Sequence, residues 1–284
     1  STIRIESTGE LSQRQLDIVD AIPSETGVDY MLSKDGEIIY IGQSSNIKKR
    51  VNQHFTKEGA RARKLQKETK KVRFERTGNE LISQLKEYAE LRRNKPSFNH
   101  SNTSKAISHA LYRGENENGY STLNIHKVDL GKNPLLTFNG FKSAENFMRR
   151  IEDEFDLCLK LVGISQAKKE CSKVAEGNCN GACVQKEGSI AYNLRVQQAL
   201  DKYTLTGKNV VLIDKGREIG EYSAILIKNG QYKGYGFYEL NHQINNLHIL
   251  ESIITPAQAD ANTNYIITSY LRKKRIIKTL ELNT

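Results

Sequence analysis

The stretch GVDYMLSKDGEIIYIG, residues 27–42, decides the fold of the first part of the chain. Two runs rich in β-branched and aromatic residues, 28–33 and 37–41, flank the tripeptide Lys34-Asp35-Gly36. An Asp-Gly pair between two such runs favours a tight hairpin turn, because both residues tolerate a positive φ. The sequence therefore predicts a β-hairpin near the start of an α+β domain.

Helical patterns surround this hairpin. Apolar residues at helical spacing predict helices over 11–22, 46–55, 61–70 and 80–93, and a third strand over 72–75. Pro96 ends the last helix, since proline cannot continue the hydrogen-bond pattern. We expect residues 1–100 to form one domain, with a small mixed sheet and flanking helices.

The positive charge of the chain is concentrated in one segment. The 284 residues include 43 Lys and Arg against 33 Asp and Glu, a net charge of +10. Twelve basic and three acidic residues lie between Ile47 and Arg76, so this segment holds +9 of the excess. Clustered basic residues indicate a polyanion such as nucleic acid, because each one that neutralises a phosphate releases counterions. An anionic membrane is also a polyanion, but it is the weaker alternative because the segment lacks an apolar face that could insert into lipid. The predicted DNA contacts are Lys48, Lys49, Arg61, Arg63, Lys64 and Lys67.

Other features bear on the compartment. The sequence has no apolar run of 18 residues, which excludes a membrane-spanning helix. Its first residues lack the charged-then-apolar pattern of an export signal. We expect a cytoplasmic monomer that does not associate with a membrane.

Residues downstream of the hairpin complete a recognisable motif set. Arg50 follows Gly42 by eight residues, Glu87 lies on a predicted helix, and Lys95-Pro96-Ser97-Phe98-Asn99 comes after it. With the hairpin, this set resembles the GIY-YIG nuclease domain, most closely that of the UvrC family and its short relative Cho. The resemblance implies a metal-dependent DNA endonuclease.

The resemblance also implies roles for single residues. Glu87 would hold Mg²⁺ or Mn²⁺, since a helix-borne carboxylate can bind an ion that otherwise keeps waters and phosphate oxygens. Arg50 would grip the scissile phosphate, and Tyr40 would position or deprotonate the attacking water. His54 would lie near the reacting phosphate, one helical turn past Arg50. Asn99 would close the site.

Two positions depart from the family pattern. Asp29 stands where the first motif carries a tyrosine, and Gln43 replaces a frequent lysine. Tyr30 does not compensate, because strand alternation places it on the opposite face. We expect an active enzyme that relies on Tyr40, Arg50 and Glu87, and the alternative is a catalytically impaired DNA-binding module.

All four cysteines, Cys158, Cys171, Cys179 and Cys183, lie within 26 residues. Such a cluster favours a tetrahedral metal site or an iron–sulfur cluster over disulfides in a chain without an export signal. Their number does not separate zinc from iron. Residues 178–183 resemble the end of the UvrC and Cho cysteine region, which implies a structural [4Fe–4S] cluster, with Zn²⁺ as the second choice.

The rest of the chain reads as two further regions. A polar linker is expected at 101–105, and the predicted domains are 1–100, 101–206 and 207–284. The middle one contains a hairpin (107–112 and 121–128), helices over 144–155 and 189–201, and the cysteines. The last is α+β, with strands at 210–214, 222–228 and 232–238 and a helix over 266–275. It resembles the tails of fusions between DNA polymerase III epsilon-like exonucleases and GIY-YIG domains.

The expected function is of nucleotide-excision-repair type. The resemblance implies hydrolysis of one strand near lesions, or at branched or nicked DNA, with a UvrB-like protein as a partner. Two alternatives remain open at this point: a DNA-binding module without catalysis, and an iron–sulfur scaffold for a repair partner.

Overall fold

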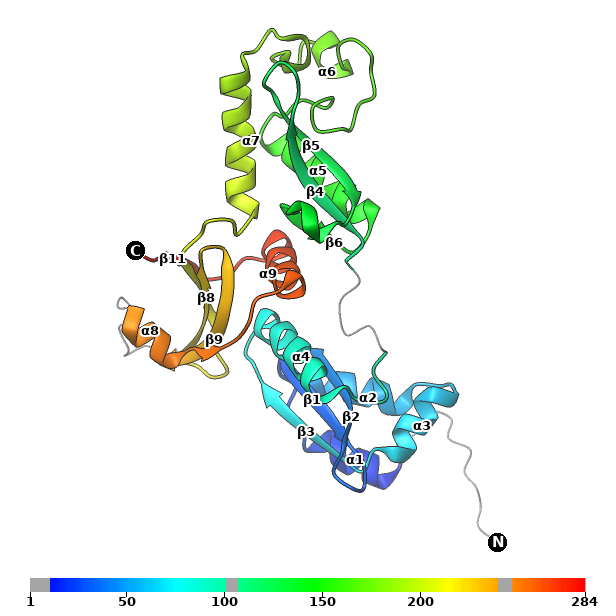
Figure 1. The fold of residues 1–284 in the computed structure, drawn as a ribbon. Coiled ribbons are helices and arrows are strands. Elements are labelled where there is room, and N and C mark those ends of the chain that lie inside the picture. The colour runs from blue at the N-terminus through cyan, green and yellow to red at the C-terminus, as the bar shows by residue number, and fades with distance from the viewer. Residues whose placement is uncertain (1–10, 101–106, 240–246, 284) are drawn as a thin grey trace.

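The computed structural model describes residues 11–100, 107–239 and 247–283, which form three small antiparallel sheets with their helices (Figure 1). The expected linker at 101–105 lies outside the described residues. Among the residues that the structure describes, no helix combines the length and the apolar character needed to cross a membrane.

The first sheet contains the predicted hairpin. Strands β1 (Gly27–Leu32) and β2 (Ile38–Ser44) pair antiparallel, and β3 (Lys71–Arg76) pairs with the other edge of β1. The sheet is antiparallel throughout, whereas a mixed sheet was expected. The chain reaches β3 through two helices and re-enters beside β1 in the opposite direction, so no parallel pair forms.

Four helices surround this sheet on the predicted segments. They are α1 (Gln13–Asp20), α2 (Ile47–Thr56), α3 (Ala60–Glu68) and α4 (Glu80–Asn94). Val51 and Phe55 of α2 pack with Met31 on one face of the sheet. Leu91 of α4 packs with Tyr30 on the other face. The alternation of β1 therefore assigns each of its side chains to one of two cores.

The middle part holds the cysteines. Strands β4 (His109–Glu115), β5 (Ser121–Lys127) and β6 (Leu136–Phe138) form a sheet. The one-turn helix η1 (Leu130–Lys132) lies in the connection between β5 and β6. Helices α5 (Phe141–Glu154) and α7 (Ser189–Tyr203) share one core with this sheet. Between them the chain forms only short turns, α6 (Ser172–Ala175) and η2 (Ala182–Val184).

The last part contains a five-stranded sheet in the order β10-β9-β8-β7-β11. Its strands are β7 (Val210–Lys215), β8 (Glu221–Lys228), β9 (Gln231–Glu239), β10 (Thr255–Pro256) and β11 (Lys278–Glu281), with helices α8 (Leu247–Ile253) and α9 (Ala261–Lys273). Helix α9 begins five residues before the expected start at 266. Asp260 and Thr263 form a capping box there, which fixes the first turn.

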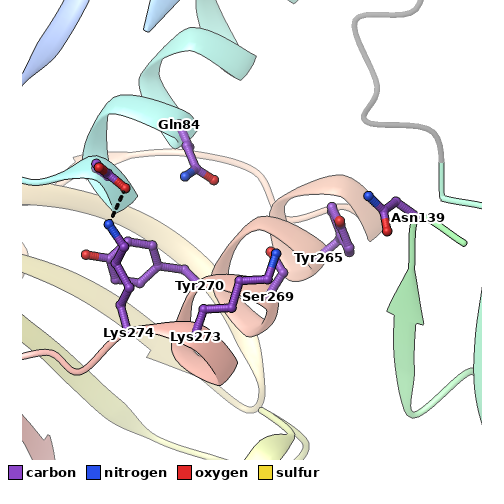
Figure 2. Close-up of a pocket in the computed structure, with 8 residues that line it drawn as sticks. Gln84, Asn139, Tyr265, Ser269, Tyr270, Lys273 and Lys274 are labelled. Atoms are coloured by element: carbon purple, nitrogen blue, oxygen red, sulfur yellow. Dashed lines mark hydrogen bonds and ion pairs between the residues drawn. The ribbon is translucent and has the colours of Figure 1, made fainter. Parts of the chain in front are cut away.

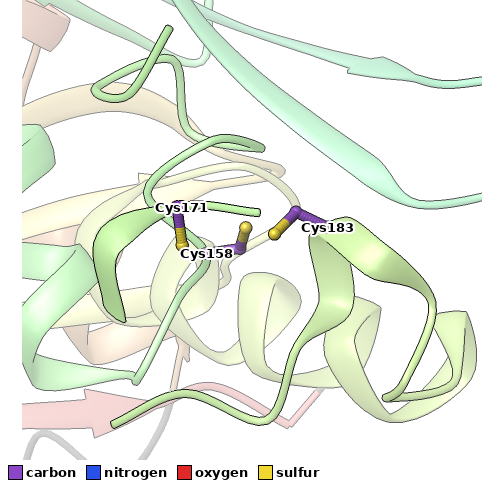
Figure 3. Close-up of side chains that lie close together, drawn as sticks. All are labelled: Cys158, Cys171 and Cys183. Carbon is purple, nitrogen blue, oxygen red and sulfur yellow. The ribbon is translucent and has the colours of Figure 1, made fainter. Parts of the chain in front are cut away.

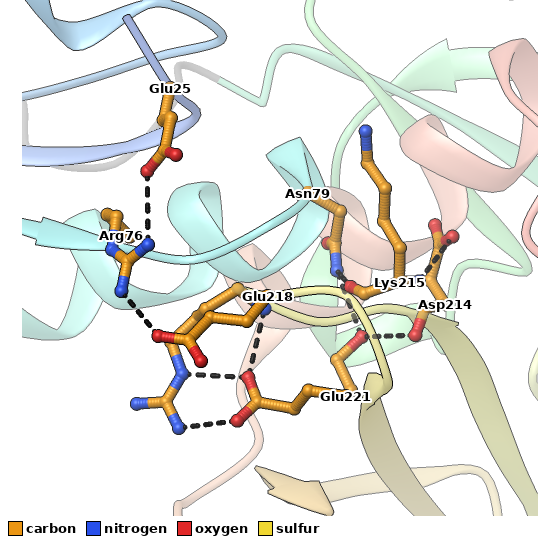
Figure 4. Close-up of polar contacts among 9 residues, drawn as sticks. Glu25, Arg76, Asn79, Asp214, Lys215, Glu218 and Glu221 are labelled. Atoms are coloured by element: carbon orange, nitrogen blue, oxygen red, sulfur yellow. Dashed lines mark hydrogen bonds and ion pairs between the residues drawn. The ribbon is translucent and has the colours of Figure 1, made fainter. Parts of the chain in front are cut away.

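Helix α4 lies between the first sheet and the last part of the chain (Figure 1). Its outer residues Leu81, Ile82, Leu85 and Tyr88 share a buried cluster with Leu212, Ile225, Ile266 and Ile267. The start of the helix is tied down as well. Asn79 Nδ2 donates to the Lys215 carbonyl and to Ser223 Oγ, each at 2.9 Å (Figure 4).

The backbones also approach closely at this contact. Gly78 has a φ of +77°, and a Cβ atom there would lie 2.0 Å from the Gly216 carbonyl oxygen. Arg76 adds an ion pair to Glu218 at 2.9 Å, on the same side of the contact (Figure 4). The first and last parts of the chain are therefore packed as one body.

Helix α9 touches the middle part too. The Arg272 guanidinium lies 4.5 Å from the centre of the Phe138 ring, and Arg150 donates to the Arg272 carbonyl at 2.7 Å. A pocket opens where the three parts meet, and Gln84, Asn139 and Tyr265 each line it from a different part (Figure 2). Lys274 at its rim pairs with Glu80 at 2.7 Å.

Candidate active site

Tyr40 and Arg50 meet beside the first sheet. Tyr40 lies on β2 and is half-buried, and Arg50 reaches it from α2 while remaining exposed. Burial raises the pKa of Tyr40 first of all, Asp29 raises it further, and a hydrogen bond with Arg50 lowers it. A guanidinium can only donate, so the Tyr40 oxygen accepts and its own hydrogen can point elsewhere.

Asp29 faces the same place from β1. It is fully buried, and neither carboxylate oxygen has a hydrogen-bond partner. Burial raises the pKa of Asp29 from 3.8 to about 7, against the opposing effect of Arg50. The structure thus places a carboxyl group where the family motif carries a tyrosine.

Gly42 lies next to the side chains of Tyr40 and Asp29. It pairs with Asp29 across the hairpin. A Cβ atom on Gly42 would lie 3.1 Å from the Tyr40 hydroxyl and 3.2 Å from Asp29 Oδ1. The missing side chain therefore allows Tyr40 and Asp29 to pack closely beside the Gly42 backbone.

His54 packs against Tyr40 from the last turn of α2. The two rings meet edge to face, with centroids 4.7 Å apart. His54 Nε2 is buried without a hydrogen-bond partner. Burial, and then the charges of Arg50 and Lys57, lower the pKa of His54 to about 4, so the imidazole is neutral at neutral pH.

Glu87 approaches the site from α4. It is half-buried, and its charge acts on both Tyr40 and Arg50. One or two carboxylates in a partly open setting fit Mg²⁺, which keeps several of its waters in proteins. The half-buried Glu87 offers one such carboxylate beside Tyr40 and Arg50.

The side chain of Asn99 forms hydrogen bonds with the backbone of β2. Its Oδ1 accepts from the Ile41 N–H at 2.9 Å, and its Nδ2 donates to the Ile41 carbonyl at 2.8 Å. The side chain imitates a neighbouring strand at the open edge of the sheet. It thereby fixes the backbone directly after Tyr40.

The two departures from the motif have defined places. Tyr30 is fully buried on the face opposite to Asp29, with the Arg73 guanidinium 4.4 Å from its ring centre. This agrees with the alternation argument. Gln43 accepts a hydrogen bond from Ser83 Oγ at 2.8 Å, so it ties β2 to α4.

The basic segment is divided between two surfaces. Of the predicted DNA contacts, Lys49, Arg61, Arg63, Lys64 and Lys67 are exposed on α2 and α3, and Lys48 is half-buried. Arg73 and Arg76 belong elsewhere. Arg73 covers Tyr30 on the far face, and Arg76 pairs with Glu25 and Glu218 (Figure 4). The exposed positive charge of this segment therefore lies on α2 and α3, and the basic group beside Tyr40 is Arg50.

Three of the four cysteines converge in the middle part. The Sγ atoms of Cys158, Cys171 and Cys183 all lie within 4.8 Å of one another (Figure 3). Cys179 is not in this group, although a four-cysteine set was expected. The Gly181 N–H donates to its Sγ at 3.4 Å, and its charge contributes to the raised pKa of Cys171.

The donor set fits a thiophilic metal. Burial raises the pKa of Cys158 to about 12, so the uncomplexed thiol is protonated at neutral pH, and a metal would displace that proton. Thiolates about 2.3 Å from one tetrahedral ion are about 3.8 Å apart, which is within the 4.8 Å that bounds the separations here. The sulfur trio is thus compact enough to share a single ion.

Two regions of the chain match known protein families. Residues 25–100 match the UvrC-like GIY-YIG domain, and residues 107–202 match the middle domain of the UvrC/Cho excinuclease. The first match contains Asp29, Tyr40, Arg50, Glu87 and Asn99. The second contains the four cysteines.

Curated relatives match about two thirds of this chain. UvrABC system protein C of Legionella pneumophila strain Lens is 24% identical over 209 residues, which cover 68% of this chain and 32% of that protein. The protein of the same name from Methylococcus capsulatus is 26% identical over 201 residues, covering 66% and 31%. This chain therefore spans about a third of the length of the relatives it matches.

Among solved structures, the GIY-YIG N-terminal endonuclease domain of UvrC from Thermotoga maritima, bound to magnesium as its catalytic cation, is 19% identical. The match covers 32% of this chain and all of that one, with a TM-score of 0.30.

Proposed function

Since this chain joins a UvrC-like GIY-YIG domain to a UvrC/Cho middle domain, we propose that it is a metal-dependent endonuclease that hydrolyses a phosphodiester bond of DNA. The convergence of Tyr40, Arg50 and Glu87 at one edge of the first sheet carries this proposal. A phosphate placed there would have a guanidinium, a hydroxyl and a carboxylate within reach.

The residues divide the work by their chemistry. Arg50 binds the phosphate and balances its charge, which strengthens as the attacking oxygen approaches. The free hydrogen of the Tyr40 hydroxyl orients the water. Glu87 would hold Mg²⁺ or Mn²⁺, which supplies further charge neutralisation when bound. Neutral His54 supports the Tyr40 ring from behind and adds no charge.

A cleavage assay on nicked, lesion-bearing and intact duplexes tests the activity. The native chain should cut one strand when Mg²⁺ or Mn²⁺ is added. Arg50→Ala and Glu87→Gln should each lower the rate by about 10²–10³-fold, the usual cost of one charge-stabilising group. Glu37→Gln, in the exposed hairpin turn, is the control for a lost carboxylate and should cut normally.

Absence of metal-dependent cutting by the native chain would contradict the proposal. Binding that weakens with salt but leads to no cutting would instead mark a DNA-binding module. Substitution of Lys49 or Lys64 by alanine should weaken binding in either case, because both side chains are exposed on α2 and α3.

The biological setting follows from the relatives. Their name assigns them to the UvrABC system, and this chain spans about a third of their length. We propose a single-strand incision near lesions, assisted by a UvrB-like repair protein. A cleavage map on a lesion duplex, with and without such a protein, would show whether the cut is directed to one side of the lesion.

The cysteines of the middle part are proposed to hold a structural metal centre. Family resemblance points to [4Fe–4S], and the short sulfur separations favour Zn²⁺ as the second candidate. Anaerobic purification with metal analysis separates them, because only iron gives a brown colour and a broad visible absorption band. Cys171→Ser should lose the metal in either case. Comparison with Cys179→Ser tells whether the fourth cysteine is a ligand, and a native chain without metal would refute the centre.

A further inference from the structure

We propose that the pocket between α4, α9 and the end of β6 binds a phosphate group of the DNA backbone, and that Lys273 supplies its positive charge. The pocket has a volume of about 530 Å³ and lies where the three parts of the chain meet (Figure 2). Neither family match contains Lys273, because the matches end at residues 100 and 202. The inference rests on DNA as the substrate of the proposed function and adds a second contact with it.

Positive charge gathers at this end of α9. Lys273 is exposed on the last turn of the helix and forms no ion pair within the described part of the chain. Lys274 pairs with Glu80 at 2.7 Å, so the acidic side chain in the pocket lining is already neutralised. Arg150 donates to the Arg272 carbonyl at 2.7 Å, which brings two more cations to the same helix end. A concentration of like charge in a hollow attracts an anion.

Neutral hydrogen-bond donors line the same pocket. Tyr265, Ser269 and Lys273 are four residues apart and therefore share one face of α9 (Figure 2). Burial raises the pKa of Tyr265, so its hydroxyl keeps its hydrogen, and it has no hydrogen-bond partner among the described residues. Asn139 is exposed, and its Oδ1 accepts from Ser143 Oγ at 3.0 Å, which leaves the Nδ2 hydrogens for a ligand. A phosphate oxygen needs such donors beside a cation.

The pocket lies on the stripe of α4 that also carries Glu87. Glu80, Gln84 and Glu87 are four and three residues apart, so they follow one line along the helix. Glu80 and Gln84 line the pocket, and Glu87 lies at the candidate active site. The helix rises about 10 Å from Glu80 to Glu87, and phosphates of one strand are about 3.4 Å apart along the duplex axis. The pocket would therefore hold a phosphate about three nucleotides from the one that is cut.

Binding of a nicked duplex, measured without divalent metal at several salt concentrations, tests the pocket. Lys273→Ala should weaken binding about 10-fold near 0.1 M salt, and the slope of log affinity against log salt should become shallower by about 0.9. Lys273→Arg keeps the charge and should bind as the native chain does. Lys233→Ala, at an exposed position of β9 outside the pocket lining, is the matched control for a lost lysine.

A neutral methylphosphonate linkage, moved one position at a time along the duplex, locates the phosphate. One such linkage, about three nucleotides from the cut, should weaken binding by the native chain. Lys273→Ala should be insensitive to that linkage, because its contact there is already lost. Inorganic phosphate is the second probe. If it raises the melting temperature of the native chain but not of Lys273→Ala, while both bind DNA equally, the pocket holds a free anion and the proposal is wrong.

Equal binding by the native chain and Lys273→Ala at every salt concentration would also overturn the proposal. A lower melting temperature of that variant would then assign Lys273 to the helix dipole, which a cation at the C-terminus of α9 balances. If Lys273→Ala weakens binding but the native chain never cuts, the phosphate site stands and the nuclease function fails. If the native chain cuts and Lys273→Ala binds and cuts equally well, the phosphate site alone fails.

Discussion

At the scale of single residues, the buried Asp29 makes the stability of the protein depend on pH. A carboxyl group whose pKa is raised on folding binds protons more tightly in the native state than in the unfolded chain. Its stabilising contribution is fully present below pH 3.8 and is lost as the pH rises through about 7. The native protein therefore becomes less stable over this range, as far as this residue is concerned.

Asp29→Asn should consequently be more stable than the native chain at pH 8. The difference between 3.8 and about 7 corresponds to an upper limit of roughly 4 kcal/mol, because the asparagine needs no ionised form. Urea unfolding at pH 4.5 and pH 8 measures it, and the gain should shrink at the lower pH. A gain of the same size at both values would mean that ionisation of Asp29 is not its source.

At the scale of elements, β2 is an edge strand whose open side is bonded by the side chain of Asn99 at Ile41. The two hydrogen bonds from Asn99 to Ile41 replace a missing neighbouring strand. Edge strands are otherwise free to fray. The position of Tyr40 therefore depends on the hydrogen bonds that the Asn99 side chain makes with the next residue of the strand.

Asn99→Ala should destabilise the protein by about 1–3 kcal/mol, since it leaves two backbone groups without partners. Hydrogen exchange at the Ile41 amide should accelerate, and cleavage should slow because Tyr40 is less firmly placed. Asn118→Ala, in the exposed turn between β4 and β5, serves as the control. Unchanged exchange at Ile41 would show that β2 keeps its place without the side chain.

The hairpin, α2 and α4 could be predicted because their signals are local: an Asp-Gly turn and apolar residues every three or four positions. Strands β10 and β11 could not, because they have two and four residues and form only by pairing with distant strands. In the site, motif spacing brought Tyr40, Arg50 and Glu87 together. The unpartnered state of Asp29 and the backbone role of Asn99 depend on side-chain packing, which spacing does not reveal.

At the scale of the whole molecule, the first and last parts of the chain share one hydrophobic cluster, and the middle part contacts α9. The outer face of α4 is buried by the last sheet and α9, and α9 also reaches β6 of the middle part. The helix that carries Glu87 is thus supported from both sides. A mutation that destabilises the last part of the chain should therefore also destabilise α4, the helix that carries Glu87.

Ile267→Ala tests this coupling. Ile267 is fully buried in the cluster that joins α9 to α4, and its truncation should cost about 2–5 kcal/mol. Hydrogen exchange should increase in α4 as well as in α9. Ile190→Ala, on the exposed face of α7, is the control. Faster exchange confined to residues 207–283 would show that α4 keeps its order without this support.

The position of α4 has a consequence for how such a protein can be recombined. A segment that ends near residue 100 looks like a self-contained cassette, yet its last helix belongs to two cores. A transplanted homologous segment would bring its own outer helix face and would meet a foreign sheet. Chimaeras should therefore fold stably only when Asn79, Leu81 and Leu85 are exchanged together with the residues that they contact in the last part of the chain. The segment that can be exchanged is thus set by this interface and not by the boundary near residue 100.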